Sequence, residues 1–233
     1  MSDCRYHIVN VKSVGSTMEE VKKFDNNTLL IADEQTNGRG KGGRDWDAKM
    51  SNNIYMSLII DAANERLDYS QLSFLTSIAI RENIESFDDM NNEILSKWPN
   101  DILVNGKKCV GILLEYDLMF QRLVIGVGVN VDYYPENTTS LFEPTSLNKE
   151  GITVDKSKFV NKFLEKFDEL LLIWKEEGFT EIRNRWLEKA YGLGDTIYVG
   201  NVNGIFEDIN YDGTLVLRLE DGELLEFYSG DVF

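Results

Sequence analysis

Histidine and cysteine are almost absent from this sequence. His7 is the single histidine, and Cys4 and Cys109 are the two cysteines. The cysteines form no CxxC pair and have no zinc-ligand spacing, so we expect neither a disulfide framework nor a zinc site. One histidine argues against a His-based metal site and against a Ser-His-Asp triad. We therefore expect no catalysis that depends on an imidazole, and we expect His7 to be a surface or strand residue.

Long apolar runs are also missing. The stretches 29–32 and 54–60 are far shorter than the ~20 apolar residues that a membrane-spanning helix needs. The N-terminal residues MSDCRYHIVN lack a basic region followed by an apolar stretch, so no signal peptide is predicted. We expect a cytoplasmic protein that does not associate with membranes.

Positive charge is scarce as well. The chain has 24 Lys and Arg against 40 Asp and Glu, which gives a net charge of −16. A field of that sign repels nucleic acid and anionic lipid, and no run of basic residues offsets it. The basic residues that do cluster lie at 39–44 and 97–108, among glycines and aromatic residues. This pattern predicts no nucleic-acid partner but a local positive pocket for a small anionic substrate.

The apolar patterning predicts a larger part of strands and helices followed by a small β-barrel. A hydrophobic fraction of 42% is sufficient for a packed core. Strands are predicted at 6–12, 28–33, 54–60, 94–98, 102–104, 109–118, 123–131, 194–199, 204–210, 214–219 and 223–228, and helices at 17–24, 69–87, 156–176 and 180–190. The last four strands are separated by Gly, Asn and Asp turns, and such a short segment is expected to pack on the larger part.

The stretch 35–53 is predicted to be a long functional loop. Apolar residues nearly vanish there, and Gly38, Gly40, Gly42 and Gly43 fall within six positions. Glycines let backbone N–H groups approach a ligand, and the basic side chains of this loop can meet carboxylate or phosphate. The glycine spacing formally matches a dinucleotide fingerprint, but the loop leads into another strand and not into a helix, so we reject that match. There is no Walker A sequence. On this segment alone, a phosphate clamp and a solvated loop remain open.

Two further segments carry candidate site residues. Lys97-Trp-Pro-Asn-Asp101 and Lys107-Lys108 flank a predicted hairpin, which can bring two ammonium groups to one pocket; an ordinary surface hairpin is the alternative. In Gly126-Val-Gly-Val-Asn130, alternating small residues end an apolar strand. They leave room for a flat ligand against the sheet, or for close backbone packing.

Together these segments resemble the biotin–protein ligases. The family's glycine-rich biotin-binding loop matches GRGKGGRDW, its central motif matches KWPND, its hairpin lysine and glycine match KKCVGILLE, and its later glycine strand matches GVGVN. Gly-Ser-Thr at 15–17 matches the family's Ser-Thr-Asn motif, except that Met18 replaces the Asn. Lys41 stands where the family usually has Arg, and lysine lacks the planar two-pronged donor. The end of the chain, Gly230-Asp231-Val232, fits the family's C-terminal domain.

The resemblance implies an α+β fold with a mixed central sheet and flanking helices. Residues 1–190 would form the catalytic domain, which is like that of class II aminoacyl-tRNA synthetases, and residues 191–233 an SH3-like small barrel. The implied catalytic residues are Lys108, Arg39 and Lys41. The implied biotin-binding residues are Ser16, Thr17, Gln35, Arg39, Gly40, Lys41, Lys108 and Gly111, and the ATP-binding residues are Arg44, Trp46, Lys97, Asn100, Asp101, Gly128 and Asn130. Mg²⁺ would arrive with ATP, with Asp101 as a candidate ligand.

The implied reaction is the activation of biotin with ATP and its transfer to a lysine of a biotin carboxyl carrier protein. The resemblance also implies a homodimer. Three alternatives remain open. A lipoate–protein ligase uses a related fold and the same two-step chemistry. A biotin-responsive repressor would need a helix-turn-helix, for which the first strand at about residue 6 leaves no room. A non-catalytic scaffold would use the C-terminal barrel for protein contacts.

Overall fold

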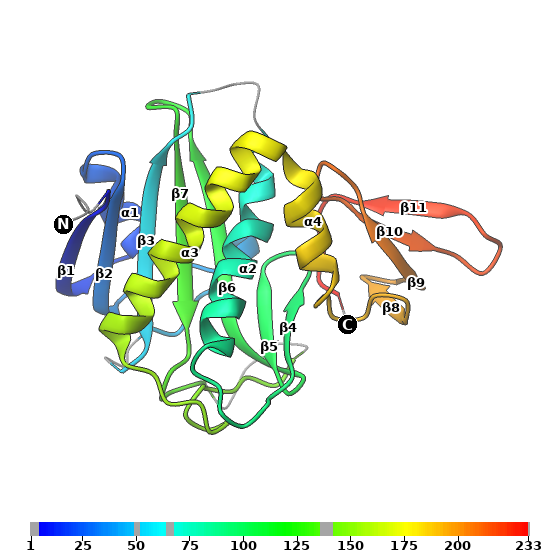
Figure 1. Ribbon diagram of the computed structural model, residues 1–233, viewed down its shortest axis with the longest axis horizontal. Coiled ribbons are helices and arrows are strands. Elements are labelled where there is room, and N and C mark those ends of the chain that lie inside the picture. The colour runs from blue at the N-terminus through cyan, green and yellow to red at the C-terminus, as the bar shows by residue number, and fades with distance from the viewer. Residues whose placement is uncertain (1–4, 49–51, 64–67, 136–141, 233) are drawn as a thin grey trace.

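The computed structural model describes residues 5–48, 52–63, 68–135 and 142–232. Within them, a seven-stranded sheet forms the centre of the molecule (Figure 1). Its strands, in spatial order, are β1 (His7–Val14), β2 (Thr28–Gln35), β3 (Ile54–Asp61), β7 (Arg122–Val129), β6 (Lys107–Asp117), β5 (Asp101–Val104) and β4 (Ile94–Lys97). The β1–β2 pair is parallel and the other pairs are antiparallel. The predicted mixed sheet is confirmed.

Two helices, α2 (Leu72–Glu85) and α3 (Lys156–Glu177), cover one face of this sheet, and α4 (Phe179–Leu187) packs beside them, toward the C-terminal strands (Figure 1). Helix α3 begins where the Asp155 carboxylate accepts a hydrogen bond from the Lys158 backbone N–H at 2.8 Å, which is a typical N-cap. It buries Phe159, Phe163 and Phe167, which lie at a spacing of four residues on one side of the helix. These side chains join the main hydrophobic core between helices and sheet.

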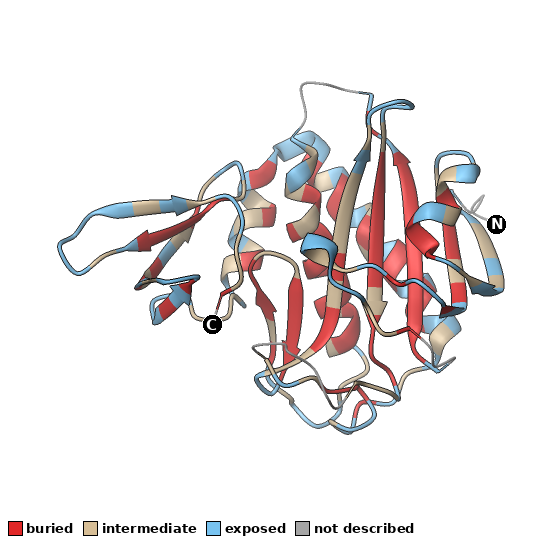
Figure 2. Ribbon diagram, turned by 180° about the vertical axis from the view of Figure 1, so that it is seen from behind, coloured by how far each residue is buried: buried red, intermediate tan, exposed pale blue. Residues whose placement is uncertain are grey.

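The opposite face of the sheet carries the short helix α1 (Thr17–Glu20) and the 3₁₀ turn η1 (Val21–Lys23). A smaller apolar cluster lies beneath them, made of Met18, Val21, Leu30, Ile59 and Val124. Successive residues of a strand point to opposite faces, so Val124 joins this cluster while its neighbours in β7 join the main core. Figure 2 shows the molecule from behind, with the central strands β3 and β7 largely buried and β1, at the edge of the sheet, without a buried residue.

The C-terminal strands form a second sheet in the order β11 (Leu224–Phe227), β10 (Leu215–Arg218), β9 (Val202–Ile209) and β8 (Thr196–Val199). All three pairs are antiparallel. The four predicted strands are confirmed, but no closing pair joins β8 to β11 within the described residues, so they form an open sheet and not a closed barrel. Buried residues of this sheet, such as Phe206, belong to the main core.

Several local predictions are refined by the structure. Gly178, with φ 81°, separates α3 from α4 at the point where two helices were expected. Asn105 and Gly106 have φ of 51° and 74° and connect β5 to β6, as their hairpin signal predicts. In its described part, the expected loop after β2 contains the 3₁₀ turn η2 (Lys41–Gly43) and an isolated bridge between Arg39 and Asp45. None of the helices described is long and apolar enough to cross a membrane.

Candidate functional site

A cavity opens on the face of the sheet that carries α1. Its empty volume, including the open mouth, is about 420 Å³. Its walls come from the start of α1, the end of β2, the loop after β2, the turn between β4 and β5, and the middle of β6 and β7. The lining residues are Ser16, Thr17, Met18, Gln35, Arg39, Gly40, Lys41, Trp46, Asn100, Gly111, Ile112, Leu113, Gly126, Val127 and Gly128. Residues predicted from four separate sequence segments therefore meet around one hollow.

One end of the cavity is a buried, neutral, polar site. The Gln35 side-chain oxygen accepts hydrogen bonds from the backbone N–H and the hydroxyl of Thr17 at 2.7 and 3.0 Å. Ser57, which the sequence did not single out, donates its hydroxyl to Thr17 Oγ1 at 2.8 Å. The Ser16 hydroxyl is buried and has no hydrogen-bond partner among the described residues. Because buried polar groups are normally paired, Ser16 is available to hydrogen-bond a polar but uncharged ligand group.

The floor of the cavity is a patch without side chains. Gly111 on β6 pairs directly with Gly128 on β7, so the two glycines lie side by side in the sheet. The Trp46 ring lies against both: a Cβ placed on either glycine would come within 2.6 Å of it. The indole N–H is buried and unpaired within the described part of the chain. The glycines thus leave room for a flat group, and here the loop's own tryptophan takes that place.

Two predicted lysines meet beside this floor. Lys108 Nζ lies 2.7 Å from one carboxylate oxygen of Asp101, and Lys97 Nζ lies 3.5 Å from the other. Burial lowers the pKa of Lys97, although the Asp101 charge opposes the shift. Lys108 Nζ is also 5.7 Å from the centre of the Trp46 ring. The two ammonium groups therefore converge beside the cavity, as the hairpin arrangement predicted.

The cations of the glycine-rich loop all have partners within the protein. Arg39 contacts the carboxylates of Glu19 on α1 and Glu115 on β6. Lys41 donates to the Gly230 carbonyl at 3.3 Å, and burial lowers its pKa. Arg44 forms a two-pronged ion pair with Asp231 at 3.0 and 3.1 Å. Burial would raise the pKa of the Asp231 carboxyl, but the Arg44 hydrogen bonds and charge outweigh it and lower the pKa. The C-terminal segment thus holds one side of this loop.

The structure leaves five predicted site residues outside the cavity lining: Lys108, Arg44, Lys97, Asp101 and Asn130. Of these, Asn130 is buried, and its amide donates to the Thr145 carbonyl at 3.0 Å. Within the described ranges, no group of three acidic, His or Cys side chains gathers that could hold a metal ion. Asp101, the candidate magnesium ligand, is paired with two lysines.

Asn53 supports the site and was missed from the sequence. Its side-chain oxygen accepts the backbone N–H groups of Val131, Asp132 and Tyr133 at 2.9, 3.1 and 3.1 Å, and its amide donates to the Tyr133 carbonyl at 2.8 Å. It holds the segment that leaves β7. We expect Asn53→Ala to lower the free energy of unfolding by about 2 kcal/mol, because it leaves several backbone groups unpaired. Thermal denaturation checks this against Asn52→Ala at the exposed neighbour, and equal melting temperatures would contradict it.

Comparison with known proteins agrees with the resemblance to the biotin–protein ligases that the sequence motifs indicate. Residues 11–131 match the biotin/lipoate A/B protein ligase family, and residues 198–233 match the biotin protein ligase C-terminal domain. The bifunctional ligase/repressor BirA of Bacillus subtilis is 32% identical over 97% of this chain and 73% of its own. The biotin–[acetyl-CoA-carboxylase] ligase of Paracoccus denitrificans is 32% identical over 81% of this chain and 83% of its own.

This chain also has the fold of a solved biotin protein ligase. The biotin protein ligase from Aquifex aeolicus in complex with biotin and ATP superposes with a TM-score of 0.84 at 27% identity, covering 97% of each chain. The family match spans just over half of the described fold, and it includes the residues that line the cavity. The chain therefore belongs to the biotin/lipoate A/B protein ligase family.

Proposed function

We propose that the protein is an ATP-dependent biotin–protein ligase. It forms biotinyl-5′-AMP from biotin and ATP and then transfers the biotinyl group to a lysine of a biotin carboxyl carrier protein. One observation carries this proposal: a single cavity has a buried neutral polar end at Ser16, Thr17 and Gln35, and a cationic end beside Lys108. Biotin has the same division, with a neutral ureido ring at one end and a carboxylate at the other.

Biotin is assigned to the cavity by this match of polarity. The hydroxyls of Ser16 and Thr17 and the Gln35 amide would hydrogen-bond the ureido ring, since Ser16 has an unused hydroxyl at that end. The backbone of Arg39, Gly40 and Lys41 would cover the valeryl tail, and the tail would lie over Gly111. Met18, where the family usually has Asn, supplies a thioether to the lining in place of an amide. The ureido group would therefore be held by fewer side-chain hydrogen bonds than the family pattern provides.

ATP is assigned to the cavity floor. The paired glycines accept a flat ring, so the adenine would lie at Gly128, bordered by Asn130 and by Trp46, whose ring would first have to leave the glycines. The phosphates would meet the cations and amide that surround this place, which are Lys41, Arg44, Lys97, Lys108 and Asn100. Mg²⁺ would be carried by the phosphates. It would neutralise phosphate charge when bound, and Asp101 is its candidate protein ligand because a carboxylate oxygen suits that ion.

In the first step a biotin carboxylate oxygen attacks the α-phosphorus of ATP, and the bond to the pyrophosphate oxygen breaks. The carboxylate is ionised near neutral pH, so this step needs no side-chain base. Two anions must approach each other, and positive groups at the reacting phosphate therefore contribute most. Lys108 is the proposed catalytic residue. Lys97 shares Asp101 with it and can balance that carboxylate when Lys108 turns to the phosphate.

In the second step the uncharged ε-amine of the carrier lysine attacks the acyl carbon of the mixed anhydride. AMP leaves with the electron pair of the broken C–O bond, and the amine loses a proton. Water would compete for the same carbon, so covering the cavity with the glycine-rich loop protects the intermediate. The carrier protein is the partner that the family implies.

We also propose a domain division, an oligomeric state and a cellular location for the protein. We infer that residues 1–190 act as the catalytic domain and 191–233 as a C-terminal domain whose Asp231 reaches the loop. A homodimer is proposed through the edge of the main sheet formed by β1. A cytoplasmic location without nucleic-acid or membrane partners is consistent with the net charge of −16.

The test of this function is pyrophosphate release from ATP and Mg²⁺, measured with biotin, with lipoate and with neither acid. Of the two acids, only biotin is expected to start the release of pyrophosphate and to raise the melting temperature of the protein. Release with lipoate and not with biotin would instead identify a lipoate–protein ligase. No release with biotin or with lipoate would contradict acid activation and favour a non-catalytic role.

A further inference from the structure

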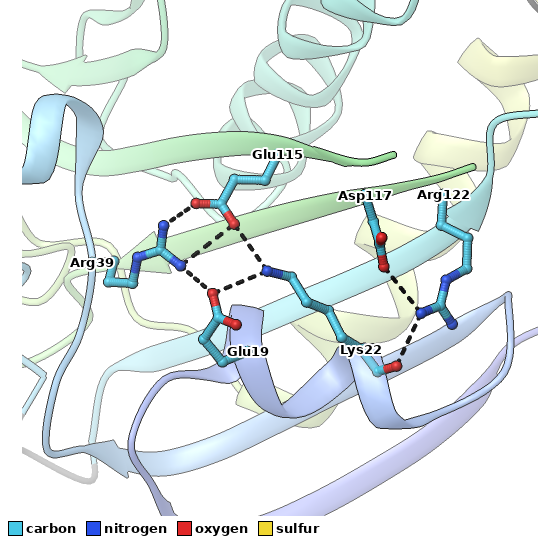
Figure 3. Close-up of polar contacts among 6 residues, drawn as sticks. All are labelled: Glu19, Lys22, Arg39, Glu115, Asp117 and Arg122. Carbon is cyan, nitrogen blue, oxygen red and sulfur yellow. Dashed lines mark hydrogen bonds and ion pairs between the residues drawn. The ribbon is translucent and has the colours of Figure 1, made fainter. Parts of the chain in front are cut away.

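A ring of four charges joins the glycine-rich loop to the main sheet and α1, next to the cavity that Arg39 lines (Figure 3). The Arg39 guanidinium contacts the carboxylates of Glu19 on α1 and Glu115 on β6. Lys22 Nζ contacts the same two carboxylates at 3.0 and 3.3 Å. Two cations therefore face two anions, and each carboxylate contacts both cations. We call Glu19 and Glu115 the acidic clamp.

The acidic clamp already satisfies the Arg39 side chain. Its two terminal nitrogens contact the two oxygens of Glu115, which is the fork-to-fork pairing that arginine forms with a carboxylate. One of these nitrogens also contacts Glu19. An incoming phosphate would have to displace two carboxylates from this guanidinium, and its positive charge is balanced within the ring. Lys108, in contrast, faces a single carboxylate that it shares with Lys97.

Glu115, one of the two residues of the clamp, lies on the same strand and face as the cavity floor. Gly111, Leu113 and Glu115 alternate along β6 and therefore point to one side of the sheet. Trp46 lies against Gly111, and Arg39 is held at Glu115, four residues further along, a rise of about 13 Å. Leu113, between the two, lines the cavity. The loop is thus attached to one strand on both sides of the hollow.

The two attachments are linked through the loop backbone. Trp46 N–H donates to the Gly38 carbonyl at 3.0 Å, and Gly40 N–H donates to the Arg44 carbonyl at 2.7 Å. Arg39 and Asp45 form an isolated antiparallel bridge between these bonds. Residues 38–46 therefore form a small closed ribbon. Because its two sides are hydrogen-bonded to each other, the position of Arg39 is coupled to that of Trp46.

We propose that Glu115, assisted by Glu19, is a positioning residue that holds Arg39 and so keeps the glycine-rich loop across the cavity. In this assignment the Arg39 side chain fastens the loop, and it replaces the expectation that this guanidinium binds phosphate. The effect on the loop follows from the contacts alone. Its effect on biotin activation rests on the proposed function.

The first experiment measures hydrogen–deuterium exchange of the loop amides in the ligand-free protein. Glu115→Gln removes the charge and keeps the shape. Glu20→Gln is the matched control, because Glu20 pairs with Lys23 in the following turn η1 and not with a residue of the loop. Exchange at the Gly40 and Trp46 amides is expected to accelerate about three- to tenfold in Glu115→Gln, as for the loss of a small ion-pair network. The control is expected to match the unaltered protein. Unchanged exchange in Glu115→Gln, with an unchanged melting temperature, would overturn the proposal.

The second experiment separates a fastening role from phosphate binding by a double-mutant cycle. Pyrophosphate release with biotin and ATP is measured for Arg39→Gln, Glu115→Gln and the combined variant. If Arg39 fastens the loop, the single variants raise the KM for biotin by similar factors, and the combined variant is no worse than either. A loss of kcat in Arg39→Gln alone, with Glu115→Gln as active as the unaltered protein, would overturn the proposal. If the unaltered protein releases no pyrophosphate, the proposed function fails, whereas the exchange experiment still decides the role of the clamp.

Discussion

Lys108→Met is expected to lower the rate of pyrophosphate release from biotin and ATP by about a thousandfold. The ammonium group lies beside the cavity floor, 5.7 Å from the centre of the Trp46 ring, where the two anionic substrates are proposed to meet. Charge that develops on the phosphate is stabilised most by a fixed cation in a site shielded from water. Methionine keeps most of the stem of the side chain and removes only the charge. A rapid-quench measurement of a single turnover reports this step without product release.

The matched control for this variant is Lys107→Met. Lys107 is the neighbouring residue on β6, and its ammonium lies 3.5 Å from Glu150, away from the cavity lining. Both variants remove one positive charge from the same strand, so a general electrostatic effect would appear equally in the two. Nearly normal release by Lys108→Met, or an equal loss in Lys107→Met, would remove Lys108 from the mechanism.

Gly128→Val is expected to raise the KM for ATP by about a hundredfold. A Cβ at this position would lie 2.6 Å from the Trp46 ring and 2.7 Å from its nitrogen, and valine adds two more methyl groups. The ring would have to leave the paired glycines, and overpacking of this kind costs about 1–3 kcal/mol. The flat surface proposed for adenine would be lost at the same time. Isothermal titration calorimetry with ATP measures the accompanying loss of ATP affinity, and the same titration with biotin shows whether biotin binding is kept.

Gly15→Ala is a suitable control for the glycine variant, because a Cβ at Gly15 would meet no atom within 4 Å. It is expected to bind ATP normally. The melting temperature of Gly128→Val is expected to fall only slightly, since the displaced ring belongs to a loop at the surface of the sheet. Unchanged ATP affinity in Gly128→Val would exclude the paired glycines as the adenine site.

The sequence predicted the parts of the site that depend on local pattern. Strand alternation placed small residues of β7 on one face, and the hairpin signal at Asn105 and Gly106 brought Lys97 and Lys108 together. The order of the main strands could not be read from local signals, because their register depends on pairing between distant segments. The same reason explains the C-terminal strands: turn residues mark each strand, but closure depends on whether the first and last strands pair.

The partners of the loop cations were beyond sequence reasoning. Arg39 and Glu115 are 76 residues apart, and Arg44 and Asp231 are 187 apart. The protein has 40 acidic residues, so nothing in the sequence indicates which of them face the loop. Sequence reasoning therefore treated every loop cation as a ligand contact. The structure shows that each of them has a partner within the protein. Lys108 shares its one carboxylate partner with Lys97 and lies beside the Trp46 ring, which makes it the lysine best placed for the chemistry.

The central claim is that one cavity activates biotin and passes it to a protein lysine. Mass spectrometry of a biotin carboxyl carrier domain, incubated with this protein, biotin, ATP and Mg²⁺, tests it most directly. We predict that the carrier gains one biotinyl group, and that it gains none when its acceptor lysine is replaced by arginine or when Lys108→Met is used for the same short incubation. An unmodified carrier, despite release of pyrophosphate from ATP and biotin, would contradict the transfer step.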